Sequence, residues 1–135
     1  MVIARTPTER RPFVLPEERE LPPEQQTTFW LRDLTAAESA QLKDLGMAYD
    51  QGSDSTMMRT GTSALRAVRA GLVGWDNFAD EHGTPVEFAT HRAAPLGRSI
   101  DAPNDATLDR IPLDVLLLLA GAITNTRLTL EDAGN

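Results

Sequence analysis

The pattern of apolar and polar positions predicts two strands near the start of the chain. Residues 27–34, TTFWLRDL, are rich in β-forming side chains, and Phe29 and Leu31 alternate with the side chains beside them. A shorter apolar run at residues 13–15 is the second candidate. We expect the two segments to pair antiparallel across the proline-rich stretch that connects them.

Three helices are predicted after these strands, because apolar positions recur at helical spacing. The first begins at a capping box, in which Thr35 and Glu38 each accept a hydrogen bond from the other's backbone amide, and it is expected to end just before Gly46. The second spans residues 56–73. The third spans residues 112–125, with a proline in its first turn.

The chain is predicted to form one domain with flexible ends. Its 135 residues can bury one modest core. Dense prolines predict a flexible arm over residues 1–11, and we expect a single mainly helical domain over 12–127 and a tail over 128–135. Residues 89–107, rich in small and polar side chains, are predicted to form a long exposed loop. The predicted fold class is mainly α: a small helical domain with a short N-terminal β-strand or hairpin element and a proline-rich arm.

Residues 71–88, GLVGWDNFADEHGTPVEF, are predicted to form a helix end, a turn and a short extended segment. Trp75 and Phe78 are expected to fold back on the preceding helix as structural anchors, because aromatic residues are rare in this chain. The turn is expected between Asp80 and Gly83, where the glycine can adopt a positive φ.

The sequence carries no recognised catalytic or metal-binding pattern. Its acidic residues do not fit the register of an EF-hand calcium loop, whether the loop starts at Asp76 or at Asp80. His82 and His91 are the only histidines, and their spacing is not that of a zinc pair. The serine-nucleophile and phosphate-binding motifs are also missing. We therefore predict no catalytic residue, no metal and no cofactor.

Composition narrows the range of partners. The net charge of −7 disfavours nucleic acid, whose phosphates need a basic surface. The chain has no cysteine, which excludes disulfides and thiolate metal sites. The longest apolar run, residues 115–123, is about half of the roughly 20 residues that span a bilayer, and residues 1–14 lack the apolar core of a signal peptide. We expect a soluble cytosolic protein with neither nucleic acid nor membrane as its partner.

Two helical faces are candidates for contact with a partner. One lies on the second predicted helix and is either a solvated face or a basic stripe that meets an acidic partner: Arg59, Arg66 and Arg69. The last helix is apolar around its whole circumference, which fits full burial and contact with a partner equally well. On that helix we expect the exposed, partner-binding face to be formed by Leu116, Leu119 and Ile123.

The order of these features resembles the tail assembly chaperones of long-tailed, siphophage-like bacteriophages and related prophages. The resemblance covers residues 12–127, and GLVGWDNF with the glycine and phenylalanine that follow it is its most specific part. The matching positions are residues 31–35 (LRDLT), 71–78 (GLVGWDNF), Gly83, Pro85, Phe88 and residues 108–112 (LDRIP).

This resemblance implies a function in viral tail morphogenesis. Members of the family bind the long tape measure protein, keep it soluble, help to recruit tail tube subunits and are absent from the finished virion. The chain would then act in the bacterial host cytoplasm, as the shorter product where a programmed frameshift also makes a longer one, and self-association stays open. No catalytic residue is implied. The alternatives are a virion structural protein, such as a head–tail connector or minor tail protein, and, third, a small enzyme or regulator.

Overall fold

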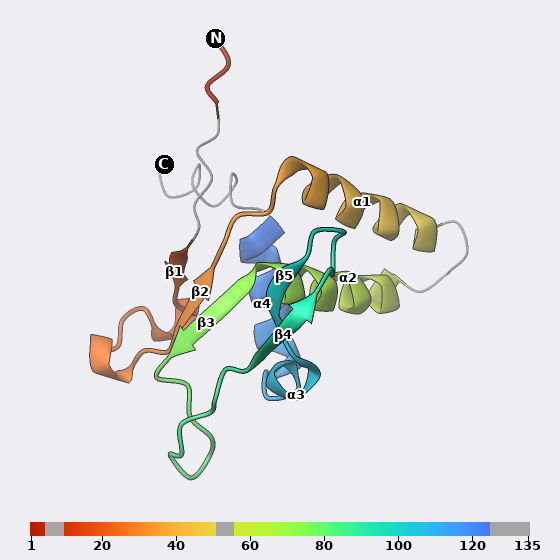
Figure 1. The fold of residues 1–135 in the computed structure, drawn as a ribbon. Coiled ribbons are helices and arrows are strands. Elements are labelled where there is room, and N and C mark those ends of the chain that lie inside the picture. Colours follow the sequence, from red (N-terminus) through yellow and green to blue (C-terminus); the bar gives the residue numbers. More distant parts are fainter. Residues whose placement is uncertain (5–9, 51–55, 125–135) are drawn as a thin grey trace.

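The chain folds into helices and antiparallel strands in a computed structural model, which describes residues 1–4, 10–50 and 56–124 (Figure 1). The described residues form two separate sheets, so the predicted mainly α class is wrong and the fold is a mixture of α and β. In chain order the elements are β1 (Arg11–Phe13), the short 3-10 helices η1 (Pro16–Glu18) and η2 (Pro23–Gln25), β2 (Thr28–Leu31), α1 (Ala36–Asp50), α2 (Thr56–Gly71), β3 (Leu72–Asp76), β4 (Thr90–Ala93), β5 (Ile100–Pro103), α3 (Asp105–Leu108) and α4 (Leu113–Thr124).

The larger sheet has the strand order β1-β2-β3, and both pairs of strands are antiparallel. Phe29 on β2 lies opposite Phe13 on β1 and opposite Trp75 on β3. The predicted pairing of the two N-terminal segments is therefore confirmed, although the first strand lies slightly earlier in the chain than predicted. Leu15, which the prediction placed in that strand, is instead buried in the core just before η1.

The third strand of this sheet replaces the end of a predicted helix. α2 ends at Gly71 and β3 begins at Leu72, whereas the apolar pattern predicted a helix up to Val73. Leu72 lies opposite Leu31, and both side chains are at most 1% exposed. Pairing with β2 therefore decides the conformation of this segment, because helix propensity is a weak preference that tertiary contacts override.

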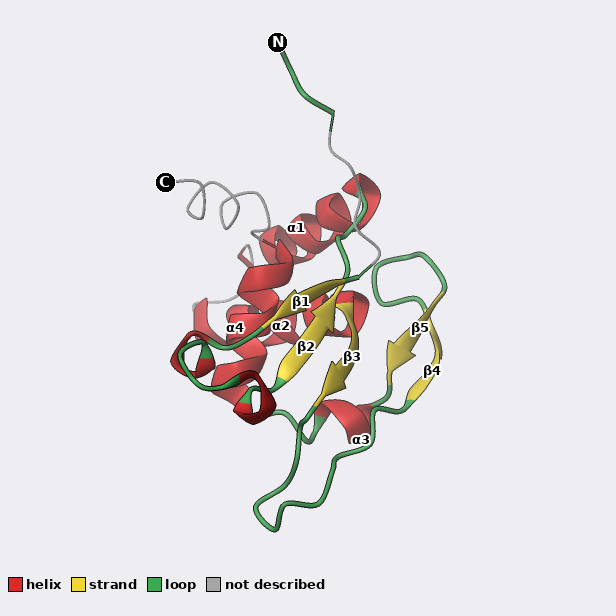
Figure 2. Cartoon of the chain, turned by 90° about the vertical axis from the view of Figure 1, so that its left-hand side faces the viewer, coloured by secondary structure: helices red, strands yellow, loops and turns green. Residues whose placement is uncertain are grey.

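One face of the three-stranded sheet is covered by helices. Phe29 and Leu31 on β2 point into a core that contains Val68 of α2 and Leu119 of α4, and all four side chains are at most 1% exposed. Figure 2 shows α2 and α4 on the same side of the strands. α1 packs on α2, outside this central layer.

Gly71, at the end of α2, allows α4 to approach closely. A methyl group at this position would lie 2.6 Å from Cγ2 and 2.9 Å from Cγ1 of Ile123, which is closer than carbon atoms pack. We expect Gly71→Ala to lower the free energy of unfolding by about 1–3 kcal/mol, because the side chain of Ile123 or the two helices must shift. Gly61→Ala, in the same helix, is the control, since its methyl group meets nothing within 4 Å and alanine favours a helix by about 1 kcal/mol. Equal effects of the two substitutions in urea denaturation would contradict this account.

Residues 89–107 form a second sheet and a short helix, so the predicted exposed loop is wrong. β4 and β5 pair antiparallel over their whole length, and α3 follows them. The buried hydroxyl of Thr107 donates to the carbonyl of Ala89 at 2.9 Å and accepts from the N–H of Ala89 at 3.0 Å. Leu96, between the two strands, is buried in the main core. Contacts between distant residues thus hold a segment that has the composition of a loop.

The predicted boundaries agree with the structure at α4 but not at α1. α4 lies within the span of the third predicted helix, whereas α1 continues past Gly46, its predicted stop, to Asp50. Arg11, which the prediction assigned to the arm, belongs to β1. The predicted tail at residues 128–135 lies outside the described residues, as do residues 5–9 of the arm.

Candidate functional site

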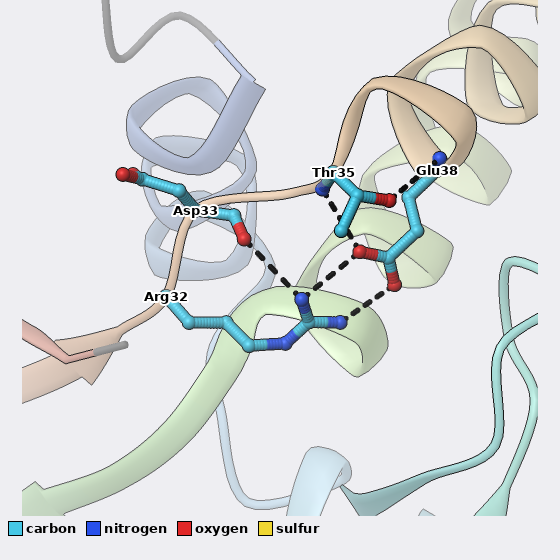
Figure 3. Close-up of polar contacts among 4 residues, drawn as sticks. All are labelled: Arg32, Asp33, Thr35 and Glu38. Atoms are coloured by element: carbon cyan, nitrogen blue, oxygen red, sulfur yellow. Dashed lines mark hydrogen bonds and ion pairs between the residues drawn. The ribbon is translucent and has the colours of Figure 1, made fainter. Parts of the chain in front are cut away.

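A buried ion pair joins the end of β2 to the start of α1 (Figure 3). The guanidinium of Arg32 donates to both carboxylate oxygens of Glu38, at 3.0 and 2.7 Å. Thr35 N–H donates to the Glu38 carboxylate at 2.9 Å, and Glu38 N–H donates to the Thr35 hydroxyl at 3.1 Å. The predicted capping box is therefore confirmed, and Arg32 is the further partner that the local pattern did not reveal.

The Glu38 carboxylate stays ionised throughout the neutral pH range. Burial raises its pKa, but the hydrogen bonds from Arg32 and Thr35 and the charge of Arg32 outweigh burial and lower the pKa from 4.5 to about 2. A carboxylate that is ionised and fully bonded in this way stabilises structure and does not transfer protons at neutral pH. Residues 31–35, which are among the positions that match the resemblance, thus contribute Arg32 and Thr35 to a structural ion pair and its hydrogen bonds.

Arg11 ties the larger sheet to the C-terminal end of α4. Its Nε donates to the carboxylate of Asp33 at 3.2 Å, and its Nη2 donates to the carbonyl of Ala122 at 2.8 Å. A cation at this end of a helix is also stabilised by the helix dipole. α4 is therefore held near its C-terminal end as well as by its packing on α2.

Aromatic side chains form a cluster at one end of the larger sheet. Trp75 packs edge-to-face against Phe29, Phe78 and Phe88, with ring centroids 6.3, 4.8 and 4.9 Å apart. Its indole N–H donates to the carbonyl of Val86 at 2.8 Å. The predicted anchors Trp75 and Phe78 do pack together, but with rings of β2 and of the segment after the turn, whereas the sequence predicted contact with the preceding helix.

The turn after Phe78 is closed by Asp80. The Asp80 carboxylate accepts two backbone N–H groups of the turn, at 2.9 and 3.0 Å, and its carbonyl accepts Gly83 N–H at 3.0 Å. Gly83 has a φ of 80°, as predicted. An open hollow of about 330 Å³ lies beside the turn and is lined by residues 75–79, 83, 85 and 86. Asp76, the carboxylate that lines it, already accepts the indole N–H of Trp30 at 2.8 Å.

The histidines lie on the surface and lack the surroundings of a metal site. His82 is 78% exposed and lies 3.5 Å from the carboxylate of Glu81, and His91 is exposed on β4. Among the residues whose side chains the structure describes, no three His, Asp or Glu lie close enough together to hold a metal ion. Among the helices that the structure describes, none combines the length and the apolar character that spanning a membrane requires.

The predicted basic face of α2 makes internal contacts where its side chains are described. Arg66 Nη1 donates to the carbonyl of Pro95 at 3.3 Å, and Arg69 Nη2 pairs with the carboxylate of Asp105 at 2.8 Å. The side chain of Arg59 lies outside the described residues. Arg66 and Arg69 therefore fasten the β4–β5 region and α3 to α2.

α4 has one buried face, and it is the face that was predicted to be exposed. Leu116, Leu119 and Ile123 are 7, 0 and 3% exposed and belong to the core. They share one side of the helix, as their offsets predicted, but this side packs on α2 and the sheet. The prediction that these three residues form the exposed face is therefore wrong.

The opposite face of α4 is apolar as well. Leu113, Leu117 and Leu118 are 65, 38 and 46% exposed. Offsets of three and four place Asp114 and Gly121 on the same side of the helix, and we define these five residues as the outer face of α4. Asp114 was the signal that could have identified this face, because it is the only charged residue in the helix and a charge marks the side that faces water.

Comparison of the chain with family models, with curated proteins and with solved structures finds no match. Its function is therefore inferred from its own residues, from the outer face of α4 and from the resemblance in sequence pattern.

Proposed function

We propose that this protein is a tail assembly chaperone of a long-tailed bacteriophage or prophage, which binds the tape measure protein and helps to recruit tail tube subunits. The resemblance over residues 12–127 supports this function, and the exposed leucines on the outer face of α4 carry it. A chaperone that keeps an apolar helix soluble needs a fixed apolar surface of its own. In this proposal the chain acts in the bacterial host cytoplasm, before the virion is complete, and is the shorter member of any frameshifted pair.

The size of the outer face suits temporary binding. Burying the exposed parts of its three leucines would contribute on the order of 3 kcal/mol, if a whole leucine contributes about 2 kcal/mol. A dissociation constant of 1 mM already corresponds to about 4 kcal/mol. One such contact is therefore weak and reversible, whereas many copies along one long partner can coat it and still be displaced. Weak single contacts suit a chaperone that tail tube subunits must later displace from the tape measure protein.

Co-expression with the tape measure protein tests this proposal. We expect the tape measure protein to be insoluble alone and soluble together with the wild-type chain. Leu117→Glu and Leu118→Glu should fold like the wild type in circular dichroism but lose this effect, because an apolar interface cannot solvate a charge. Leu21→Glu, at another leucine that is 41% exposed, is the matched control and should keep the effect.

Failure of the wild-type chain to bind or solubilise the tape measure protein would overturn the chaperone proposal. Mass spectrometry of purified particles would then test the alternative, since a chain found there in stoichiometric amounts would be a virion structural protein such as a head–tail connector or minor tail protein. Full activity of both glutamate variants would instead place the chaperone surface away from the outer face of α4.

A further inference from the structure

We propose that the outer face of α4 docks one amphipathic helix, whose apolar stripe is bordered by basic side chains and crosses α4 at Gly121. This inference rests on the proposed function and specifies which kind of segment in the partner would bind. Two features of the face carry it in addition to the leucines: the glycine at its C-terminal end and the carboxylate in the first turn of the helix.

Gly121 lies at the C-terminal end of the outer face and adds no side chain to it. Leu117 and Leu118 precede it by one helical turn, so they flank the place that its side chain would fill. A methyl group there would meet nothing within 4 Å, in contrast to Gly71, where a methyl group would collide with Ile123. Alanine would favour the helix more than glycine does, so internal packing gives no reason for glycine at this position.

A partner helix does give such a reason. The distance between the axes of two packed helices depends on the side chains at their contact. Glycine allows the closest approach of another backbone, because it has no Cβ atom. Leu117 and Leu118, one turn before Gly121, would then hold the apolar stripe of that helix, as in other surfaces that bind an amphipathic helix.

Asp114 gives the outer face a negative charge that selects the partner. Its side chain is exposed, and the structure shows no ion pair to it from the described residues. The chain also carries a net charge of −7, so the local carboxylate and the long-range field both favour a basic segment. A second copy of this chain carries the same net charge and is repelled, which makes it the weaker candidate for this face.

Synthetic helical peptides test the charge requirement without the tape measure protein. Two peptides share one stripe of leucine and alanine and differ only in having lysine or glutamate beside it. We expect the lysine peptide to bind the full-length wild-type protein about tenfold more tightly than the glutamate peptide in low salt, measured by fluorescence anisotropy. Asp114→Lys should abolish this preference. Asp44→Lys, on the exposed surface of α1, changes the net charge equally and should largely retain it.

Gly121→Ala tests the close approach of the partner helix. The variant should melt about 2–5 °C higher than the wild type, because alanine favours the helix. It should nevertheless bind the lysine peptide about tenfold more weakly, because the methyl group keeps the partner helix away. Unchanged or tighter binding by Gly121→Ala, or equal binding of the two peptides to the wild type, would overturn the inference.

These outcomes separate the inference from the proposed function. If the tape measure protein is kept soluble but the glycine and charge effects are absent, the inference fails while the chaperone proposal stands. If the peptides bind as expected but the tape measure protein stays insoluble, the face docks a basic helix of another partner and the chaperone proposal fails. Dimerisation of the wild type that Leu117→Glu abolishes, measured by analytical ultracentrifugation, would assign the face to a second copy and overturn the inference.

Discussion

Replacing Glu38 with alanine should lower the free energy of unfolding by about 3–5 kcal/mol, as expected when one partner of a buried ion pair is removed. Glu38 is 1% exposed, and its loss leaves the guanidinium of Arg32, which is 11% exposed, without the acceptor of two hydrogen bonds. The N–H of Thr35 loses its acceptor as well. Urea denaturation of the wild type and the variant measures the difference.

A double substitution separates the effect of the buried charge from that of packing. Arg32→Met combined with Glu38→Leu removes both charges and should recover most of the lost stability, because apolar residues of similar volume often replace a buried ion pair without loss. Glu17→Ala, at an exposed position of η1, should change stability by less than about 0.5 kcal/mol. If Glu38→Ala is as stable as the wild type, the ion pair does not hold α1 to β2.

The same ion pair predicts how stability depends on pH. The pKa of Glu38 is about 2 in the folded protein, against an ordinary value of 4.5, so the unfolded chain binds the proton more readily. The stabilisation is complete above the ordinary pKa and decreases by about 3 kcal/mol as the pH falls from about 5 to 2. The wild type should therefore lose more stability over this range than Glu38→Gln, which cannot bind the proton. Parallel pH curves for the two proteins would contradict the lowered pKa.

The parts of the fold that the sequence predicted correctly depend on residues that lie close together in the chain. The capping box needs only the side chains of Thr35 and Glu38, and the turn needs only a residue such as Gly83 that tolerates a φ of 80°. The strand nature of β2 follows from the alternation of Phe29 and Leu31, which are buried while the residues beside them are partly exposed. In each case the residues that determine the conformation lie within a few positions of one another.

The elements that the sequence did not predict depend on partners far away in the chain. Leu72 lies in a strand because Leu31 is opposite to it, and no short window of sequence contains both residues. The β4–β5 region lacks an alternating pattern and is held by the hydroxyl of Thr107 and by Arg66 of α2. The composition of residues 89–107 therefore predicted a loop, whereas tertiary contacts form a sheet there.

The candidate site could not be predicted for a different reason. α4 is apolar on both sides, so its periodicity does not show which leucines are buried. Leu118 and Leu119 are adjacent in sequence, yet they are 46% and 0% exposed, because α2 and the sheet lie on one side of the helix only. The position of the core, which is a property of the whole fold, selects the outer face.

Trp75→Ala is expected to lower the free energy of unfolding by about 3–5 kcal/mol, the usual cost of deleting a large packed aromatic side chain. The indole joins β3 to β2 through Phe29, and it joins β3 to the segment after the turn through Phe88 and the Val86 carbonyl. Removing it therefore breaks three ring contacts and one hydrogen bond.

Trp30 is the matched control for this prediction, because it is the neighbouring tryptophan of the same sheet and points away from the core. Its contacts are the guanidinium of Arg10, 3.9 Å from the ring centroid, and the carboxylate of Asp76. An exposed cation–π pair contributes about 0.5–1 kcal/mol, so Trp30→Ala should cost well under half as much as Trp75→Ala in urea denaturation. Trp75→Phe keeps most of the ring packing and should lose only about 1 kcal/mol with its hydrogen bond. If Trp75→Ala unfolds like the wild type, the aromatic cluster does not support the sheet, and its side chains beside the turn are then available to a partner.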